Sequence, residues 1–292
     1  MKPVSFKYHD PRHLDEVVDL LSTLENAKLL AGGQTLMPMM NFRYLMPDHL
    51  IDLNKVEALD FLQVDGDYMS IGAMTRQRTL EFSSDMARHC PILLQALHFV
   101  GHRQTRNRGT MGGSLCHFDP AAELVNMTAL LDGKLQIDSK KGAREVSIAD
   151  FNQGFLTTQI AEGELLSRIR LTLPHALDGF AFVEFARRHG DFAIVACSSL
   201  MRLNAKGEIE SVKIALSGLG AAPIRPHTIE ANLLGHVPSN NIFIEAAHAA
   251  NQIESVSDAY VSAVYRQHLA RIMTYRALSQ AAKCAQEKLN VR

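Results

Sequence analysis

The stretch "RNRGTMGGSLCHFDPAAEL", residues 106–124, combines glycines, hydroxyl side chains and cations in one short segment. A second small-residue segment, "LLAGGQTLMP", occupies residues 29–38. Glycine lets a ligand approach the backbone closely because no Cβ intervenes, and successive N–H groups in such a turn form an anion-binding concavity. Thr35 in one segment, and Thr110 and Ser114 in the other, supply hydroxyls that can donate to phosphate oxygens. Together the segments predict a cradle that clasps a diphosphate from two sides.

A simpler interpretation exists for each segment taken alone. Gly32-Gly33 and Gly112-Gly113 could each be a strand-to-helix turn that requires positive φ. Neither segment has GxxxxGK[ST] or GxGxxG spacing, so a P-loop or a Rossmann site is not supported. The matched hydroxyls in both segments favour the ligand interpretation for the pair.

Bulk composition excludes several classes of protein. The chain has 292 residues, of which 47% are apolar and 21% charged, so it has the profile of a packed protein long enough for two domains. Its net charge of −1 predicts no nucleic-acid partner, and no apolar run is long enough for a membrane span. The first residues lack a signal-peptide h-region, which favours a cytoplasmic protein. Four well-separated cysteines encode no local zinc or iron–sulfur site.

The beginning of the chain has a β–α–β pattern. Asp10 and Pro11 predict the cap and first residue of a helix with an apolar face through Leu21. Residues 28–31 and 49–53 read as strands. The turn over residues 31–36 would then follow the carboxyl end of a strand, where open α/β sheets bind ligands.

The middle of the chain alternates strands and helices. A strand is predicted over residues 68–75, with Thr75 as the cap of the next helix, and a helix over residues 91–101. Asp119-Pro120 predicts the start of another helix, and further strands are expected at residues 135–138 and 165–173.

The pattern changes after His175. Residues 179–188 are aromatic and extended, a hairpin turn is predicted at residues 204–207, and residues 229–288 are helical. We therefore expect an α+β protein with a first domain over residues 1–175 and a smaller sheet-and-helix domain over residues 176–292.

Both glycine segments resemble the two FAD-binding signatures of the medium, flavin-carrying subunit of molybdenum hydroxylases, the group that includes xanthine dehydrogenase and carbon monoxide dehydrogenase type enzymes. The resemblance extends to "GFAFVEFARRHGDFAIV" and to "YRQHLARIMTYRAL", so it covers nearly the whole chain. It implies a PCMH-type FAD-binding domain built of two α/β subdomains, about residues 1–55 and 56–175. A C-terminal domain of antiparallel sheet and helices would follow.

The resemblance also implies roles for individual residues. The first segment would wrap the FAD diphosphate with backbone amides, and the second would close on it from the other side. Two carboxylates would lie near the ribose or phosphate end, a glycine against the flavin edge, two leucines in the adenine or ring pocket, and an aromatic residue near the isoalloxazine. The first segment comprises Ala31, Gly32, Gly33, Gln34, Thr35 and Leu36, and the second comprises Gly109, Thr110, Gly113 and Ser114. The carboxylates are Asp119 and Glu123, and the glycine is Gly101. The leucines are Leu165 and Leu166, and the aromatic residue is Phe192. His117 either touches the cofactor or faces solvent.

Enzymes of this type pass electrons from a molybdenum cofactor through two [2Fe–2S] clusters to noncovalently bound FAD. Each cluster requires cysteine ligands, which four scattered cysteines do not provide. The resemblance therefore implies a small iron–sulfur subunit and a large molybdenum-cofactor subunit as partners, in a dimer of heterotrimers. Substrate hydroxylation would occur on the large subunit, so no catalytic or metal-ligating residue is predicted in this chain, which would pass electrons to an external acceptor.

Other residues have simpler interpretations. His98 and His102 are spaced as metal ligands can be, but no third ligand accompanies them, so ordinary helix histidines are predicted. Cys116 is interpreted as a packed small residue, and the run Met37, Met39 and Met40 as core. A cluster of three cations either balances diphosphate charge or forms a solvated or subunit-contacting surface. These cations are Arg103, Arg106 and Arg108.

Two alternative functions remain beside the flavin subunit. One is a freestanding flavin oxidase of the vanillyl-alcohol-oxidase type, which commonly has a full substrate domain and a histidine tethering the flavin. The other is a noncatalytic nucleotide-binding assembly protein that kept the fold. Neither a full substrate domain nor a tethering histidine is obvious in the sequence, which opposes the first alternative, and the two intact glycine segments oppose the second.

Overall fold

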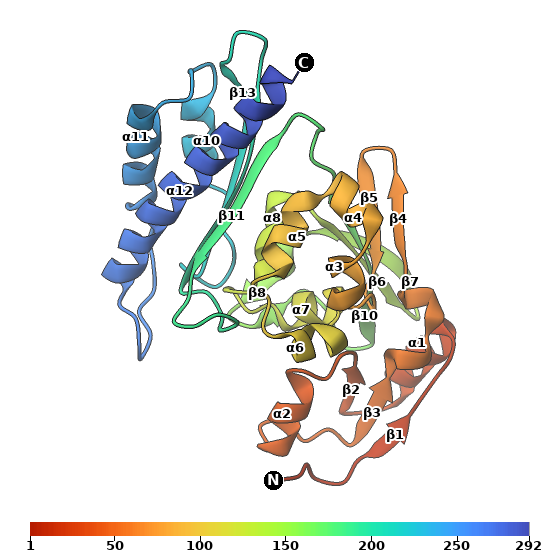
Figure 1. Cartoon of the computed structure of the whole chain (residues 1–292). Coiled ribbons are helices and arrows are strands. Elements are labelled where there is room, and N and C mark those ends of the chain that lie inside the picture. Colours follow the sequence, from red (N-terminus) through yellow and green to blue (C-terminus); the bar gives the residue numbers. More distant parts are fainter. Residues whose placement is uncertain (292) are drawn as a thin grey trace.

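The first part of the chain forms a small parallel sheet with helices beside it (Figure 1). The structure, a computed structural model, describes residues 1–291. Strand order is β1-β3-β2, with both pairs parallel, and both strands predicted here are confirmed. The elements are β1 (Lys7–His9), α1 (Leu14–Thr23), β2 (Ala27–Leu30), α2 (Leu36–Asn41), β3 (His49–Asp52) and the short 3-10 turns η1 (Leu53–Lys55) and η2 (Glu57–Leu59).

The predicted start of the first helix is wrong. Helix α1 begins at Leu14 rather than at Pro11, and His13 is its N-cap. The Glu16 carboxylate accepts the backbone N–H groups of Arg12 and His13, at 2.8 and 3.2 Å. This capping box satisfies donors at the helix start, and Asp10 instead pairs with Lys55.

The second part is a five-stranded antiparallel sheet covered by short helices (Figure 1). Strand order is β4-β5-β10-β6-β7. The strands are β4 (Leu62–Asp65), β5 (Tyr68–Gly72), β6 (Lys134–Ser139), β7 (Gly142–Ser147) and β10 (Glu164–Thr172), with the separate pair β8 (Asn152–Gly154) and β9 (Thr157–Thr158). The helices are α3 (Gln77–Glu81), α4 (Ser84–His89), α5 (Pro91–Leu97), α6 (Arg103–Arg108), α7 (Met111–His117), α8 (Glu123–Leu130) and α9 (Ile148–Phe151). The strands predicted near residues 68, 135 and 165 are confirmed.

Two boundaries in this part differ from the prediction. Thr75 does not cap α3, whose N-cap is Arg76. The Thr75 hydroxyl instead donates to the Phe61 carbonyl at 2.9 Å, which ties the end of β5 to the turn before β4. Helix α5 ends at Leu97 rather than near residue 101, and Gly101 then takes a positive φ of 48°.

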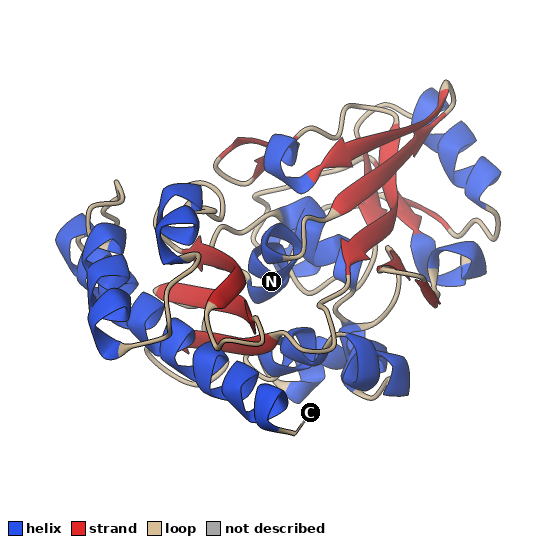
Figure 2. Cartoon of the chain, turned by 90° about the horizontal axis from the view of Figure 1, so that it is seen from above, coloured by secondary structure: helices blue, strands red, loops and turns tan. Residues whose placement is uncertain are grey.

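The C-terminal part is a three-stranded antiparallel sheet packed against three helices. Figure 2 shows the long last helix lying across one face of this sheet. The elements are β11 (Gly179–Phe185), β12 (Val195–Leu203), β13 (Ile209–Ser217), α10 (His227–Leu233), α11 (Asn240–Ala250) and α12 (Ala263–Asn290). The predicted extended segment and hairpin are confirmed, whereas the remainder predicted as helical is interrupted at residues 234–239 and 251–262.

The two faces of this sheet belong to different cores. Ala181 and Cys197 pack with the apolar side chains of α10 to α12. Phe182 and Ala196 face the other way and join the core of the five-stranded sheet and its helices. Neighbouring residues of a strand point to opposite faces, so one sheet closes both cores.

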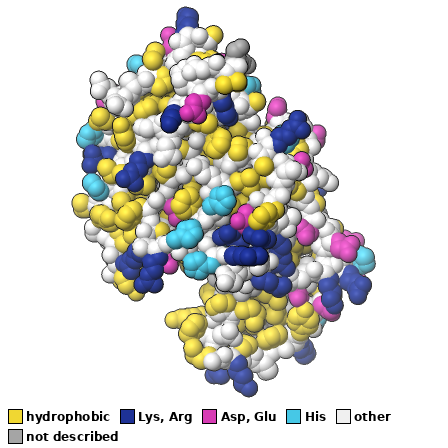
Figure 3. All heavy atoms as spheres, in the orientation of Figure 1, with side chains coloured by type: hydrophobic (Ala, Val, Ile, Leu, Met, Phe, Trp, Pro, Cys, Tyr) yellow, Lys and Arg dark blue, Asp and Glu magenta, His cyan; other side chains and the backbone are white. Residues whose placement is uncertain are grey.

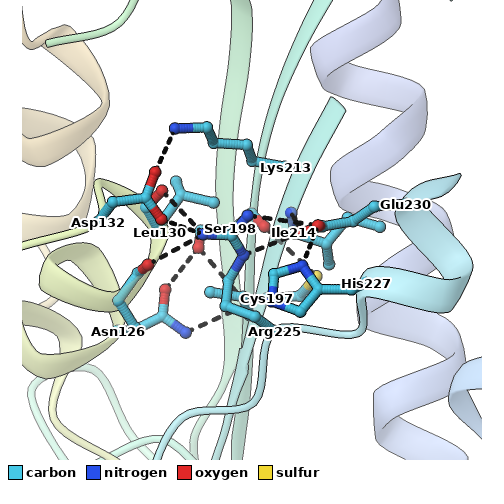
Figure 4. A network of polar contacts seen from close by, with 12 residues as sticks. Asn126, Leu130, Asp132, Cys197, Ser198, Lys213, Ile214, Arg225, His227 and Glu230 are labelled. Carbon is cyan, nitrogen blue, oxygen red and sulfur yellow. Dashed lines mark hydrogen bonds and ion pairs between the residues drawn. The ribbon is translucent and has the colours of Figure 1, made fainter. Parts of the chain in front are cut away.

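Polar contacts join α8 to the face of the C-terminal sheet that closes the core of the five-stranded sheet (Figure 4). The Ser198 hydroxyl donates to the Asn126 side-chain oxygen, and the Asn126 amide donates to the Ser217 hydroxyl at 2.7 Å. Arg225 donates to the Ala129 carbonyl at 3.2 Å, near the end of α8. These buried contacts fix the position of α8, whose first residue faces the cavity described next.

Candidate cofactor-binding site

A cavity of about 510 Å³ lies between the N-terminal sheet and the helices of the second part. All the predicted site residues except Leu165 line it. Other lining residues, which sequence reasoning missed, are Lys28, Leu29, Met39, Leu45, Leu53, Ala73, Met74, Gln77, Val100, Thr105, Gly112, Cys116, Ala122 and Gly190. Its volume falls in the range usual for small-molecule and cofactor sites.

The turn after β2 lines this cavity and carries a row of free backbone donors. Within residues 1–291, the N–H groups of residues 32–36 have no hydrogen-bond acceptor. Gly33 has a φ of +71°, which turns the chain directly after the strand. Unpaired amides at a strand-to-helix turn form a concavity that suits an anion.

Gly32 is where this turn touches the second glycine segment. A Cβ built on Gly32 would lie 2.2 Å from the Arg108 carbonyl oxygen and 2.9 Å from the Gly109 Cα. No side chain fits at that separation. The close approach of the two backbones therefore depends on glycine at position 32.

The second glycine segment is a helix and not a loop. Helix α7 is capped by the Thr110 hydroxyl, which accepts the Gly113 N–H at 3.0 Å. The Met111 and Gly112 N–H groups donate to the Thr75 and Ala73 carbonyls, at 3.0 and 2.9 Å. The second segment was predicted to close on the diphosphate from the other side, but the backbone amides of Met111, Gly112 and Gly113 are already used within the protein.

Glycine in α7 serves close packing and access to the cavity. A Cβ at Gly112 would lie 2.6 Å from the Ala73 Cβ, so glycine lets α7 pack against the end of β5. Gly113 and the Ser114 side chain border the cavity. The second segment thus contributes hydroxyl groups to the same cavity as the free amides of the first.

The chain after α7 carries the acidic residues of the site. Phe118 ends the helix with a left-handed backbone, at φ 52°. The Asp119 carboxylate accepts the Ala121 N–H at 2.9 Å, so α8 begins at Glu123 and not at Pro120 as predicted. Glu123 is 3% exposed, and burial, with a smaller contribution from Asp119, raises its pKa to about 7.

The opposite wall comes from three other segments. Leu166 on β10, Gly101 after α5 and Phe192 in the β11–β12 connection all line the cavity. Phe192 is 56% exposed, so its ring lies at the edge of the site. Leu165 points to the other face of β10 and packs with Val17, because adjacent strand residues alternate.

Three further predictions are settled by position. Cys116 is exposed to the cavity rather than packed, although the surrounding protein raises the pKa of its thiol to about 12. Met40 is buried as predicted, whereas Met39 lines the cavity. His98 follows α5 and His102 precedes α6, so the two do not share a helix.

The arginine cluster does not face the cavity. Figure 3 shows Lys, Arg and His side chains gathered above the N-terminal subdomain. Arg106 binds both oxygens of Glu81 at 3.1 Å and donates to the Val100 carbonyl. Arg103 and Arg108 are exposed, and none of the three lines the cavity, whose one Lys or Arg among the described residues is Lys28.

Residues 1–291 contain no candidate metal-ligand cluster and no helix able to span a membrane. No group of three or more His, Cys, Asp or Glu side chains is arranged to hold a metal ion. No helix combines the length and apolar character needed to cross a bilayer.

Comparison with known proteins identifies this arrangement. Residues 4–175 match the model of the FAD binding domain in molybdopterin dehydrogenase, and residues 180–281 match the CO dehydrogenase flavoprotein C-terminal domain. The chain belongs to the FAD-binding medium-subunit family of the molybdenum hydroxylases. The family expected from the two glycine segments is thus confirmed, and with it an oxidoreductase subunit of a multisubunit complex.

Relatives in this family match the chain over nearly its whole length. The 6-hydroxypseudooxynicotine dehydrogenase complex subunit alpha of Paenarthrobacter nicotinovorans is 37% identical over 96% of both chains. The carbon monoxide dehydrogenase medium chain of Hydrogenophaga pseudoflava is 33% identical over 98% of this chain and all of its own. In the quinoline 2-oxidoreductase structure from Pseudomonas putida, a chain with 34% identity superposes with a TM-score of 0.94, covering 98% of this chain and 99% of that one.

Proposed function

We propose that this medium subunit binds one FAD noncovalently in the cavity, with the diphosphate against the free amides of residues 32–36. That row of unpaired donors is the observation that carries the proposal. Ser114 lines the same cavity and can donate from its hydroxyl. The close backbone contact at Gly32 fixes the separation of the two segments.

The remaining lining fits the other parts of a dinucleotide. Leu166, Met39 and Val100 offer apolar surface for a ring, and Phe192 lies at the outer edge. When bound, FAD supplies the electron-transfer chemistry, and the protein supplies position and electrostatics. The exposed Phe192 edge leaves a route for electrons.

We further propose that electrons arrive from [2Fe–2S] clusters on a small partner subunit and leave to an external acceptor. The molybdenum cofactor and substrate hydroxylation would be on a large partner subunit, in a dimer of heterotrimers. The four thiols are unpaired and far apart, and the described residues hold no cluster of metal ligands, which supports cofactors on other chains. Free thiols also suit a cytoplasmic complex.

Titration of the purified full chain with FAD tests the cofactor proposal. We expect one FAD per chain, quenched flavin fluorescence, and all flavin released by acid precipitation. At free FAD of one hundred times Kd, the free energy of unfolding should rise by about 2.7 kcal/mol. ADP binding without FAD binding would instead support the assembly-protein alternative, and acid-stable flavin would support a covalent flavin oxidase.

A further inference from the structure

Two carboxyl groups, one buried in the cavity wall and one half-buried, have no counter-charge. Glu123 is the first residue of α8, lines the cavity, and receives no hydrogen bond from another residue within 1–291. Glu184 lies on β11, and its Oε2 atom is buried without a hydrogen-bond partner. Buried carboxyl groups normally have a cation or several donors beside them, so both require explanation.

Strand register places the two side chains next to each other. Phe182 and Glu184 share one face of β11 and lie opposite Ser198 and Ala196 of β12. Ser198 donates to Asn126, which lies one helical turn after Glu123 on α8 (Figure 4). Phe182 therefore lies near Asn126. Glu184, the next residue on the same face of β11, lies near Glu123, which is one helical turn earlier on α8.

A backbone hydrogen bond shows which end of the C-terminal sheet lies at the start of α8. The Gly218 N–H donates to the Pro120 carbonyl at 3.1 Å, just before α8. Gly218 follows Ser217, which pairs with Ala196, the β12 residue opposite Glu184. The end of the sheet that carries Glu184 thus faces the N-terminus of α8.

Few charged groups face this pair. Asp119 is the nearest acid to Glu123, and α7 contributes Cys116 and His117 at the cavity. Helix α5 carries no ionisable group. On the other elements packed against α8, Lys213 of β13 pairs with Asp132, Asp150 of α9 is exposed, and Cys197 of β12 lies in the core on the far side of the sheet.

Two cations of α12, which packs on the opposite face of the sheet, are already engaged. Lys288 donates to the Asp178 carbonyl, and Arg266 pairs with Asp258 and donates to the Gly218 carbonyl. Burial, followed by the charge of Glu123, raises the pKa of Glu184 to about 8. The α8 N-terminus favours ionised Glu123, but burial outweighs it.

We propose that Glu123 and Glu184 form a carboxyl pair that holds at least one proton when the dinucleotide is bound and offers it a neutral O–H donor. Glu123 supplies the donor at the cavity wall, and Glu184 is a positioning residue that acts through Glu123. A neutral pair suits an anionic dinucleotide, whereas two carboxylates would repel it. The inference rests on the proposed FAD site.

The direction in which FAD affinity changes with pH follows from the two raised pKa values. At pH 6 both carboxyl groups carry a proton, and they lose these protons in succession as the pH rises past about 7 and about 8. Binding of FAD to the protonated pair must then take up protons at pH 8. Affinity for FAD should be greatest at low pH and fall as the pair ionises.

Calorimetric titration of the full chain with FAD, at pH 6.0 and 8.5, measures the Kd for FAD and the number of protons taken up on binding. We expect Kd to increase about tenfold at the higher pH, which corresponds to a shift of about one pKa unit on binding. At pH 8, the binding enthalpy in buffers of different ionisation enthalpy should reveal net proton uptake. Glu123→Gln and Glu184→Gln should each reduce this uptake, while Glu245→Gln, an exposed change on α11, should not.

Three outcomes decide the inference. FAD binding at both pH values with equal Kd and no proton uptake by the unsubstituted chain would overturn the pair, whether or not the variants fold. Unchanged proton uptake in a folded Glu184→Gln variant would show that Glu184 is not part of the pair. Absence of FAD binding even at pH 6 would instead refute the proposed function.

Discussion

Gly32→Ala is expected to weaken FAD binding by about a hundredfold. The added Cβ would lie 2.2 Å from the Arg108 carbonyl oxygen, and both neighbours are backbone, so neither can rotate away. The turn must move off the second segment, which displaces the free amides of residues 32–36. Overpacking of this kind costs about 3 kcal/mol, equivalent to about a hundredfold in Kd.

Fluorescence titration of the variant with FAD measures the effect, and Gly220→Ala is the matched control. No heavy atom lies within 4 Å of a Cβ at Gly220, and its φ is not positive. We expect the control to bind FAD as the unsubstituted chain does. A folded Gly32→Ala chain with unchanged affinity would show that contact between the two segments does not shape the site.

Arg225→Met is expected to lower the free energy of unfolding by about 3 kcal/mol. The guanidinium binds Glu230 at 2.9 Å and Asp132 at 2.8 Å and donates to the Ala129 carbonyl at the end of α8 (Figure 4). Glu230 is 7% exposed, and its carboxylate also accepts the Ile214 N–H. Removing the arginine leaves a buried carboxylate with only the exposed His227 ring as a basic side-chain partner, which is a large cost.

Thermal unfolding followed by circular dichroism should show a decrease in Tm of roughly 6 to 12 °C. Lys134→Met removes a cation from an exposed pair with Glu145, which is half exposed, and should change stability by less than about 1 kcal/mol. Equal small effects of both substitutions would mean that the Arg225 network does not hold the C-terminal domain against α8.

Local sequence patterns were sufficient to place the first half of the site. A short apolar strand followed by Gly32-Gly33 predicts a turn at the carboxyl edge of a sheet, and the structure has that turn with its amides free. The second segment was harder, since glycine has two uses there. Gly112 packs against Ala73, which is distant in sequence, so a helix with engaged amides could not be distinguished from a loop.

Side-chain direction was the other source of error. The paired leucines of β10 were both assigned to the pocket, yet alternation sends Leu165 into the core and Leu166 into the cavity. Cys116 faces the cavity because of where α7 packs, and no local pattern indicates that. Glu184 could not be singled out because its relation to Glu123 depends on β-sheet register between distant segments.

A crystal structure of the full chain with FAD bound is the most direct test of the central claim. The account predicts that diphosphate oxygens lie about 3 Å from backbone nitrogens within residues 32–36, with Ser114 on the opposite side. A diphosphate located elsewhere, with these amides facing solvent, would contradict it.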